Sequence, residues 1–260
     1  MTDFVRLCEQ AARAGGEVLQ QWVGRIQVRE KGPSDLVTEA DLASQEVVKK
    51  VLLGAYPDFD FVGEEDPTGH MAGDGFRWIV DPLDGTTNYV HQFPGYAVSV
   101  ALAEGESMVA GAVFDPVARE CYSAAAGQGA FLNGQPLAVS GVTDLSQALV
   151  AASFAAKVTA GSPMIDEFVR VLLLAQSVRR LGSAALNLCH VAAGRLDAYW
   201  ARETKVWDVA AGALIVREAG GTITGLGGRP FRLSDPRFVA AATPQLHRQL
   251  CDVLDQPAAI

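Results

Sequence analysis

The sequence predicts a layered fold that mixes helices and strands, rather than a barrel. Three observations support this prediction. Helical periodicity marks both ends of the chain, short apolar runs separated by turns fill the first half, and helices alternate with strands in the second half. The chain has 260 residues, of which 49% are hydrophobic and 20% are charged. This composition supports one large domain or two small ones with a real core, and it excludes intrinsic disorder.

The first half is expected to begin with two helices and to continue as a mostly antiparallel sheet. Apolar residues recur at helical spacing from residue 2 to about residue 23. After a polar turn that contains residues 31–35, Thr38 can cap a second helix that reaches about Leu53. Apolar runs then predict strands at 77–80, 97–103, 109–114 and 121–124, with hairpin chemistry at Asn133-Gly134.

The second half is expected to alternate between helices and strands without a repeat or a linker. The predicted helices span residues 163–176, 183–193, 207–219 and 244–254. The predicted strands span residues 148–152, 178–180, 196–200, 221–224 and 238–241.

Charge and composition exclude several classes of protein. Lysine and arginine number 21 against 30 acidic residues, which leaves a net charge of −9 and argues against a nucleic-acid-binding surface. No apolar run is long enough for a membrane span, and the start of the sequence lacks a secretory hydrophobic region. The four cysteines form no CxxC pair, so a zinc site or a disulfide framework is not expected. We therefore expect a cytoplasmic protein, which could still act on an anionic substrate if bound cations invert its local field.

Two groups of carboxylates follow apolar strands. Glu64 and Glu65 come directly after Phe61-Val-Gly, where a solvated turn is the alternative interpretation. In Trp78-Ile-Val-Asp81-Pro-Leu-Asp84, Pro82 cannot donate to a ladder and should end the strand. The turn at Asp84-Gly85 brings the second carboxylate back beside the first, and the two repel each other unless a cation lies between them.

Two further carboxylates lie near expected helix starts. Asp208 stands inside the apolar run Val206–Val216, where it either caps a helix or is a buried metal ligand. In Thr38-Glu-Ala-Asp41 the local pattern indicates a capping box. The sequence around Asp208 leaves both interpretations open.

Taken together, the acidic positions predict a site for hard cations. Glu64, Asp81, Asp84 and Asp208 offer only oxygen ligands, which favour Mg²⁺, or Mn²⁺ as a substitute, over zinc or copper. Several carboxylates that serve two ions are the pattern used for displacement at phosphorus. The hydroxyls and backbone N–H groups of Thr86-Thr87-Asn88 could hold an oxyanion beside them.

These motifs resemble those of the inositol monophosphatase family of magnesium-dependent, lithium-sensitive phosphatases. The resemblance lies in Asp35-Leu-Val-Thr-Glu-Ala-Asp41, Gly63-Glu-Glu65, Asp81-Pro-Leu-Asp-Gly-Thr-Thr-Asn88, Trp207-Asp-Val-Ala-Ala-Gly212 and Glu218-Ala-Gly-Gly221, in family order. It implies an α+β fold, a layered αβαβα sandwich of the inositol monophosphatase and fructose-1,6-bisphosphatase type. It also implies a homodimer in which each chain forms a single domain over residues 1–260. The front part, about 1–145, would carry most metal ligands, and the rear part, about 146–260, would carry Asp208 and substrate recognition.

The resemblance also implies roles for individual residues. The two to three Mg²⁺ ions would be held by Glu64, Asp81, the carbonyl of Leu83, Asp84 and Asp208. Thr86, bonded to Asp41, would orient and deprotonate the attacking water with help from Glu64, a role that would replace capping for Asp41. Phosphate and substrate contacts are implied for Gly85, Thr86, Ser183, Ala184 and Lys31, the last on the loop 31–35.

The resemblance weakens at substrate recognition. Ala201 stands where inositol phosphatases have a glutamate that contacts inositol hydroxyls, and Glu203 is two residues away. Arg202 and Lys205 add positive charge that would suit a second acidic group, or that belongs to a solvated turn. The expected reaction is hydrolysis of inositol 1-phosphate or a related polyol phosphate by direct attack of metal-activated water. The alternatives are fructose 1,6-bisphosphate, histidinol phosphate, a nucleotide 3′-phosphate or NADP as substrate.

Two other functions are alternatives to this one. An aspartyl-phosphate enzyme of the haloacid dehalogenase type needs Asp-x-Asp, whereas Asp81 and Asp84 are three residues apart with Pro82 between them. A metal-binding dimeric interaction module with secondary activity is the other alternative. A small phosphorylated substrate is expected as the main partner, and neither nucleic acid nor membrane is expected.

Overall fold

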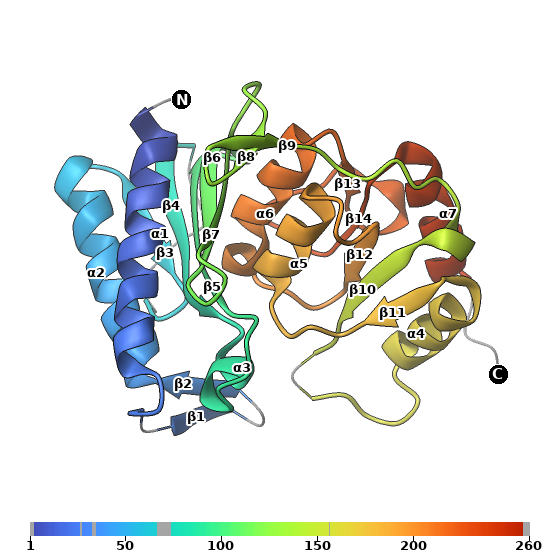
Figure 1. Cartoon of the computed structure of the whole chain (residues 1–260), viewed down its shortest axis with the longest axis horizontal. Helices are drawn as coiled ribbons and strands as arrows, with labels where there is room; N and C mark the ends of the chain where they lie inside the picture. The colour runs from blue at the N-terminus through green and yellow to red at the C-terminus, as the bar shows by residue number, and fades with distance from the viewer. Residues whose placement is uncertain (1–2, 27, 33–34, 67–73, 156, 257–260) are drawn as a thin grey trace.

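The computed structural model describes residues 3–26, 28–32, 35–66, 74–155 and 157–256, which form five layers. Helices α1 (Asp3–Trp22) and α2 (Glu39–Ala55) cover one face of a seven-stranded sheet. Helices α5 (Ala184–Ala192) and α6 (Val206–Glu218) lie between that sheet and a five-stranded sheet. Helices α4 (Pro163–Leu174) and α7 (Pro244–Leu254) cover the outer face of the second sheet (Figure 1). The α+β layering expected from the sequence is confirmed.

The first two helices pack together closely, as their sequence predicts. A Cβ added at Gly15 of α1 would lie 2.8 Å from Ser44 Oγ and from Val48 of α2, so only glycine permits this approach. At the start of α2, Thr38 Oγ1 accepts a hydrogen bond from the N–H of Ala40 at 3.1 Å. The N–H of Thr38 in turn donates to Asp41 Oδ2 at 2.8 Å, so the expected capping box is present.

The seven-stranded sheet contains the strands expected in the first half. Its strand order is β3-β4-β5-β6-β7-β8-β9, with the bounds Asp60–Gly63, Phe76–Asp84, Ala97–Glu104, Ser107–Asp115, Glu120–Ala125, Ala130–Leu132 and Gln135–Leu137. Neighbouring strands are antiparallel except β3 and β4, which are parallel. Asn133 and Gly134 turn between β8 and β9 with φ of 49° and 78°, which confirms the expected hairpin.

The prediction that β4 ends at Pro82 is wrong. β4 continues to Asp84, because Asp81 pairs with Ser99 and Asp84 pairs with Ala97. Three steps along β4 therefore face two steps along β5, which is a β-bulge that takes up one extra residue. A bulge is one of the few places where a sheet accepts proline, since no ladder hydrogen bond is required of it there.

The described residues of the expected turn at 31–35 belong to two strands. β1 (Val28–Gly32) and β2 (Asp35–Thr38) pair antiparallel, from Val28 opposite Thr38 to Gly32 opposite Asp35. The two strands form a separate two-stranded ribbon that leads directly into α2. Residues 33–34 of the expected turn lie outside the described residues.

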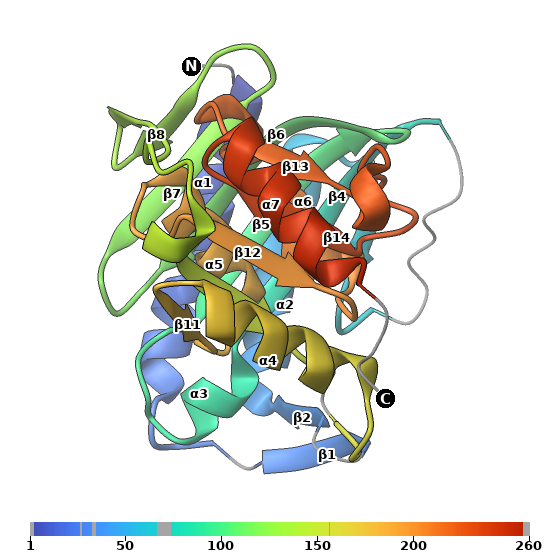
Figure 2. The ribbon, with the colours of Figure 1, turned by 90° about the vertical axis from the view of Figure 1, so that its right-hand side faces the viewer.

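The five-stranded sheet is built entirely from the second half of the chain. Its strand order is β11-β10-β12-β14-β13, with the bounds Ser177–Arg179, Leu149–Ser153, Ala198–Ala201, Phe238–Ala241 and Thr222–Thr224. The pairs that β10 makes are parallel, and the pairs that β14 makes are antiparallel. The short helix α3 (Thr86–Val90) and two 3₁₀ turns, η1 (Leu145–Gln147) and η2 (Leu226–Gly228), complete the described elements. Figure 2 looks onto α4 and α7, which pack over this sheet.

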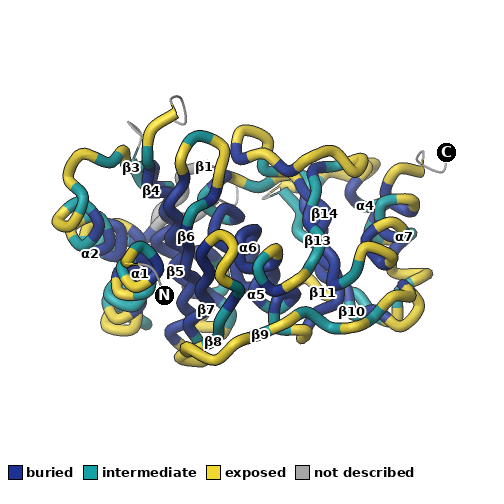
Figure 3. The backbone as a smooth tube through the Cα atoms, turned by 90° about the horizontal axis from the view of Figure 1, so that it is seen from above, coloured by how far each residue is buried: buried dark blue, intermediate teal, exposed yellow. Residues whose placement is uncertain are grey.

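Burial is concentrated where the layers meet. The buried stretches seen in Figure 3 follow the strands of both sheets and the two helices between them. Helix α6 is buried along nearly its whole length, from Val206 to Val216, with Trp207 and Asp208 as partly exposed exceptions at its start. Within the described ranges, the membrane-span criteria of length and hydropathy are met by none of the helices.

Candidate active site

Glu64 is placed by the end of β3. The N–H of Glu64 donates to the carbonyl of Val80 at 3.1 Å, which holds the end of β3 against β4. A Cβ at Gly63 would lie 2.3 Å from Gln45 Oε1, so Gln45 fills the space that glycine leaves. The same Gln45 oxygen accepts a hydrogen bond from the N–H of Glu65 at 2.9 Å. Helix α2 and strand β4 therefore jointly set the backbone at Glu64.

The bulge in β4 presents two carboxylates at the same edge. Asp81 Oδ1 accepts a hydrogen bond from the N–H of Leu83 at 2.9 Å, within the bulge itself. Asp84 Oδ2 accepts one from Ser183 Oγ at 2.5 Å and one from the N–H of Ala185 at 2.7 Å. Asp84 therefore joins β4 to the first turn of α5, far away in the sequence.

Asp208 is the third residue of α6, and the capping interpretation of its sequence is confirmed, whereas its role as a metal ligand stays a prediction. Its Oδ2 accepts a hydrogen bond from the N–H of Lys205 at 2.8 Å, which is a helix-start contact. Ser99 Oγ donates to the carbonyl of Trp207 at 3.2 Å, and Ser99 is the strand partner of Asp81. The start of α6 is thus held beside the part of the sheet that carries Asp81.

The three aspartates and Glu64 interact electrostatically. Burial and then the charges of Glu64, Asp84 and Asp208 raise the pKa of Asp81 well above its ordinary value. Burial raises the pKa of Asp84 to about 6 against the opposing hydrogen bonds from Ser183 and Ala185. Burial, followed by the charge of Asp84, raises the pKa of Asp208 well above its ordinary value. Mutual repulsion of this kind requires that the carboxylates lie near one another.

Two cavities meet at these side chains. A cavity of about 700 Å³ is lined by Glu64 and Asp208, and one of about 480 Å³ is lined by Asp84 and Asp208. Asp208 lines both cavities. A residue from the second half of the sequence therefore shares one cavity with Glu64 and the other with Asp84, both from the first half. The cavities give a small molecule access to the acidic side chains.

The donor set fits a hard cation, although the carboxylates are not drawn together around one. Glu64, Asp81, Asp84 and Asp208 are all oxygen donors in a partly desolvated setting, which is the chemistry that Mg²⁺ prefers. Within the described part of the chain, however, no three carboxylate, imidazole or thiolate side chains are arranged to hold one ion as they stand. Asp81, Asp84 and Asp208 each accept a hydrogen bond from a nearby donor, so holding a shared ion would require them to turn toward one another.

Thr86 and Asp41 lie together, as the resemblance implies, but Asp41 keeps its capping role as well. Thr86 Oγ1 lies 3.4 Å from Asp41 Oδ1 and 3.1 Å from the carbonyl oxygen of Leu83. The other oxygen of Asp41, Oδ2, accepts a hydrogen bond from Thr38 Oγ1 at 2.6 Å. The two carboxylate oxygens thus serve different partners, so the implied replacement of the capping role is wrong in this respect.

The residues expected to bind the phosphate and the alcohol differ in whether they line a cavity, are buried or lie outside the described residues. Gly85 precedes the short helix α3 (Thr86–Val90) with φ of 98°, and a Cβ there would lie 2.9 Å from the carbonyl oxygen of Gly95. Ala184 lines the 480 Å³ cavity. Ser183 is buried and its hydroxyl is engaged by Asp84 and by the N–H of Leu186 at 3.2 Å. The side chain of Lys31 lies outside the described residues.

The structure separates Ala201 from Glu203. Ala201 is fully buried in β12 and lines neither cavity, whereas Glu203 is exposed and lines both. Arg202 pairs through Nε with the buried carboxylate of Glu167 at 2.6 Å, so it is not simply part of a solvated turn. Lys205 is exposed and lines the 700 Å³ cavity. Glu203 is therefore the acidic side chain that reaches the site in this segment.

Sequence reasoning missed two contacts that assemble the site. The hydroxyl of Ser183 holds Asp84, while the substrate contact expected of Ser183 stays a prediction. Asn88 Nδ2 donates to the carbonyl oxygens of Gly95 at 2.7 Å and Leu181 at 2.8 Å, which ties α3 to two loops. A Cβ at Gly182 would lie 2.8 Å from Asn88 Nδ2, so that glycine was the available signal for the contact.

Comparison with known proteins agrees with this geometry. The model of the inositol monophosphatase family matches residues 2–257. This chain belongs to the inositol monophosphatase family. Its fold class and its activity as a phosphoric monoester hydrolase follow from that membership, which confirms the resemblance seen in the sequence.

Individual relatives cover nearly the whole chain. A fructose-1,6-bisphosphatase/inositol-1-monophosphatase of Aquifex aeolicus is 39% identical over 94% of this chain and 92% of its own length. The Nus factor SuhB of Pasteurella multocida is 37% identical over 96% of this chain and 95% of its own length. The crystal structure of the extragenic suppressor protein suhB from Bartonella henselae superposes with a TM-score of 0.92 at 34% identity, and covers 98% of this chain and 99% of that one. The names of these relatives therefore refer to more than one function.

Proposed function

We propose that the protein is a Mg²⁺-dependent phosphomonoesterase that hydrolyses inositol 1-phosphate or a related polyol phosphate by direct attack of water. The observation that carries the proposal is the position of Asp208, which shares one cavity with Glu64 and another with Asp84. Two halves of the chain are needed to bring these carboxylates together. Burial and then the neighbouring carboxylates raise the pKa values of Asp81 and Asp208, and a bound cation would offset that repulsion.

Glu64, Asp81, the carbonyl of Leu83, Asp84 and Asp208 are the proposed ligands of two to three Mg²⁺ ions. When bound, Mg²⁺ activates water and neutralises charge on the phosphate and on the leaving oxygen. The all-oxygen donor set also admits Mn²⁺. Ser183 would keep one oxygen of Asp84 occupied, so that the carboxylate presents its other oxygen to the site.

Thr86 and Asp41 are proposed to handle the proton of the attacking water. Thr86 Oγ1 would accept that proton while its own hydroxyl proton passes to Asp41 Oδ1, with Glu64 assisting. The capping contacts to Asp41 Oδ2 hold the carboxylate in one orientation throughout. Backbone N–H groups of Gly85 and Thr86 would bind the phosphate.

The substrate is proposed from what lines the cavities. Glu203 lines both cavities and would accept hydrogen bonds from polyol hydroxyls. It would thereby take the role of the glutamate that inositol phosphatases have at the position of Ala201. The double name of the Aquifex aeolicus relative makes fructose 1,6-bisphosphate the first alternative substrate. The SuhB name of another relative favours an interaction module with secondary activity as the alternative function.

The test is phosphate release by Asp84→Asn with and without Mg²⁺, across inositol 1-phosphate, fructose 1,6-bisphosphate, histidinol phosphate and adenosine 3′-phosphate. We expect Mg²⁺-dependent turnover in the parent protein, best on inositol 1-phosphate, and a loss of at least about 100-fold in the variant because a charged ligand is removed.

The control is Asp252→Asn, which makes the same change at an exposed position on α7 that lines neither cavity. It should keep the parent activity. Mg²⁺-dependent hydrolysis that persists in Asp84→Asn would refute the proposed site. Absence of turnover on every substrate, with the chain folded, would favour the interaction module.

A further inference from the structure

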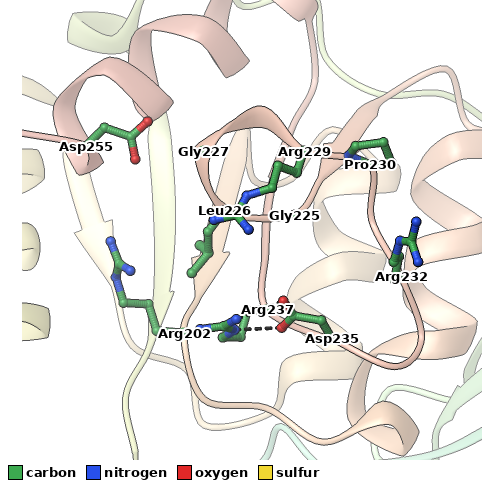
Figure 4. Close-up of a pocket in the computed structure, with 10 residues that line it drawn as sticks. All are labelled: Arg202, Gly225, Leu226, Gly227, Arg229, Pro230, Arg232, Asp235, Arg237 and Asp255. Atoms are coloured by element: carbon green, nitrogen blue, oxygen red, sulfur yellow. Dashed lines mark hydrogen bonds and ion pairs between the residues drawn. The ribbon is translucent and has the colours of Figure 1, made fainter.

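A third cavity, of about 400 Å³, is distinguished by the arginines around it. Its lining includes Arg202, Arg229, Arg232 and Arg237, with Asp235 and Asp255 as its two carboxylates (Figure 4). Four positive charges around one cavity are an exception in a chain whose net charge is −9. We call this cavity the arginine pocket.

Two of the four arginines form an ion pair with a carboxylate. Arg237 makes two hydrogen bonds to Asp235, Nε to Oδ1 at 2.6 Å and Nη2 to Oδ2 at 2.8 Å. Arg202 is paired with Glu167. Among the residues that the structure describes, Arg229 and Arg232 have no ion-pair partner. Arg237 and, more weakly, Arg229 lower the pKa of Asp235. The charges of Arg229 and Arg232 are therefore not fixed in an ion pair with any described carboxylate.

The backbone around the pocket keeps these two arginines at its edge. Phe231 and Leu233 are buried on either side of the exposed Arg232, so the alternation directs the arginine away from the core. The N–H of Gly225 donates to the carbonyl of Arg229 at 2.7 Å and closes the loop that carries it. Packing of the core thus requires Phe231 and Leu233 and makes no use of either guanidinium group.

The arginine pocket adjoins the candidate active site. Arg202, Asp235 and Arg237 line it and also line the 700 Å³ cavity that contains Glu64 and Asp208. A molecule whose phosphate occupies the carboxylate site can therefore extend past Arg202 and Arg237 toward Arg229 and Arg232. A separate small anion could also enter from solvent, since both of the unpaired arginines are exposed.

We propose that the arginine pocket binds a phosphate group, held chiefly by Arg229 and Arg232. A guanidinium group offers a planar pair of donors that matches two phosphate oxygens, and its charge is always present. The phosphate is either the second phosphate of a bisphosphorylated substrate or that of a free phosphate compound. The first of these rests on the proposed phosphatase function, whereas phosphate binding to the pocket does not.

The binding test compares the full chain, the double variant Arg229→Gln/Arg232→Gln and the control double variant Arg25→Gln/Arg248→Gln. The control removes the same charge from two exposed arginines that line none of the three cavities. Arg202 is left unchanged because its loss would strand the buried Glu167. Inorganic phosphate is titrated calorimetrically, once with Mg²⁺ and once with EDTA, after thermal unfolding has shown that all three proteins are folded.

With EDTA we expect the parent and the control to bind inorganic phosphate, and the double variant to bind it at least about 10-fold more weakly. This arm does not depend on the carboxylate site, so it remains informative if the phosphatase proposal fails. Equal affinity in the double variant and the control, or no binding by the parent, would overturn the proposal.

The kinetic test identifies the source of the phosphate. With Mg²⁺, we compare KM for inositol 1-phosphate and for inositol 1,4-bisphosphate in the same three proteins. A KM for the bisphosphate that rises about 10-fold in the double variant only, with the monophosphate KM unchanged, assigns the pocket to a substrate's second phosphate. Unchanged KM values together with lost phosphate binding assign it to a free phosphate compound.

Discussion

At the scale of single residues, the acidic side chains are held by their own local donors before any cation is considered. The Asp81 carboxylate accepts a hydrogen bond from the N–H of Leu83, and the Asp208 carboxylate accepts one from the N–H of Lys205. The Asp84 carboxylate accepts hydrogen bonds from the hydroxyl of Ser183 and the N–H of Ala185. These hydrogen bonds orient the carboxylates but do not overcome burial and mutual repulsion, because all three pKa values remain raised. The folded chain therefore gives up stability to keep these charges in place.

The first prediction concerns pH and metal removal. A raised pKa means that the folded chain holds protons that the unfolded chain has already lost, so metal-free stability falls as pH rises through the folded-state values, about 6 for Asp84. We expect the Tm in EDTA to be lower at about pH 8 than at about pH 5 on this account. Mg²⁺ should raise the Tm more at the higher pH, because it binds the deprotonated carboxylates.

Thermal unfolding in EDTA and in Mg²⁺ at both pH values measures this effect. Asp84→Asn is the comparison, since it removes one of the repelling charges and should reduce both the pH dependence and the gain from Mg²⁺. An equal gain from Mg²⁺ at both pH values would contradict the account of charge repulsion at this site.

At the scale of elements, the site depends on how strand ends are finished. β3 ends at Gly63, and the side chain of Gln45 from α2 fills the space that a side chain at position 63 would need. Gln45 also accepts a hydrogen bond from the N–H of Glu65. β4 ends at Asp84, and the bulge around Pro82 lies between Asp81 and Asp84. In both cases a proposed ligand carboxylate lies at or next to the end of a strand.

Gly63→Ala tests the importance of the β3 end. The new Cβ would lie 2.3 Å from Gln45 Oε1, so Gln45 must move away from Glu65. We expect a loss of about 1–3 kcal/mol in the free energy of unfolding, as for other overpacked sites. Phosphate release should fall as well, because Glu64 is adjacent.

The matched control is Gly54→Ala in α2, where a Cβ meets nothing within 4 Å. Alanine is the better helix former, so this variant should be neutral or stabilised by up to about 1 kcal/mol. Denaturant unfolding and phosphate release are measured for both variants. Equal stability of the two would show that Gln45 relaxes without consequence.

At the scale of the whole molecule, the five layers bring residues from both halves of the chain to one place. Helices α5 and α6 each begin beside the edge of the seven-stranded sheet and supply Ser183 and Asp208. On the far side, α4 exposes an apolar group that consists of Val169, Leu172, Leu173 and Leu174, with Leu173 78% exposed. An apolar group of this kind indicates a contact surface. We propose that it is covered in the homodimer that the family resemblance implies.

Leu173→Asp tests the proposed homodimer. A charge in the middle of the exposed apolar group should convert a dimer into a monomer without unfolding the chain, because Leu173 contributes little to the core. Light scattering after size exclusion measures the mass of the parent and the variant. The control is Val117→Asp, which places the same charge on an exposed apolar residue away from α4. A parent protein that is monomeric at all concentrations, or a variant that stays dimeric, would rule out this interface.

Much of the fold follows from local patterns in the sequence. The helices α1, α2, α6 and α7 lie within a few residues of where apolar spacing and capping residues predict them. The carboxylates Glu64, Asp81, Asp84 and Asp208 stand out in the sequence because each interrupts or ends an apolar run. These features are local, and physical rules for capping, periodicity and turns apply to them directly.

Contacts between distant residues were decided only by the tertiary structure. Nothing near Asp84 indicates that Ser183, 99 positions later, holds it, or that Ala201 is buried while Glu203 reaches the cavities. The arginine pocket likewise gathers residues from β12, η2 and β14 or their flanks. The sequence by itself determined which chemical groups are available and which elements carry them. Their convergence depends on how the layers pack, because the free energy of packing belongs to surfaces that are formed by residues far apart along the chain.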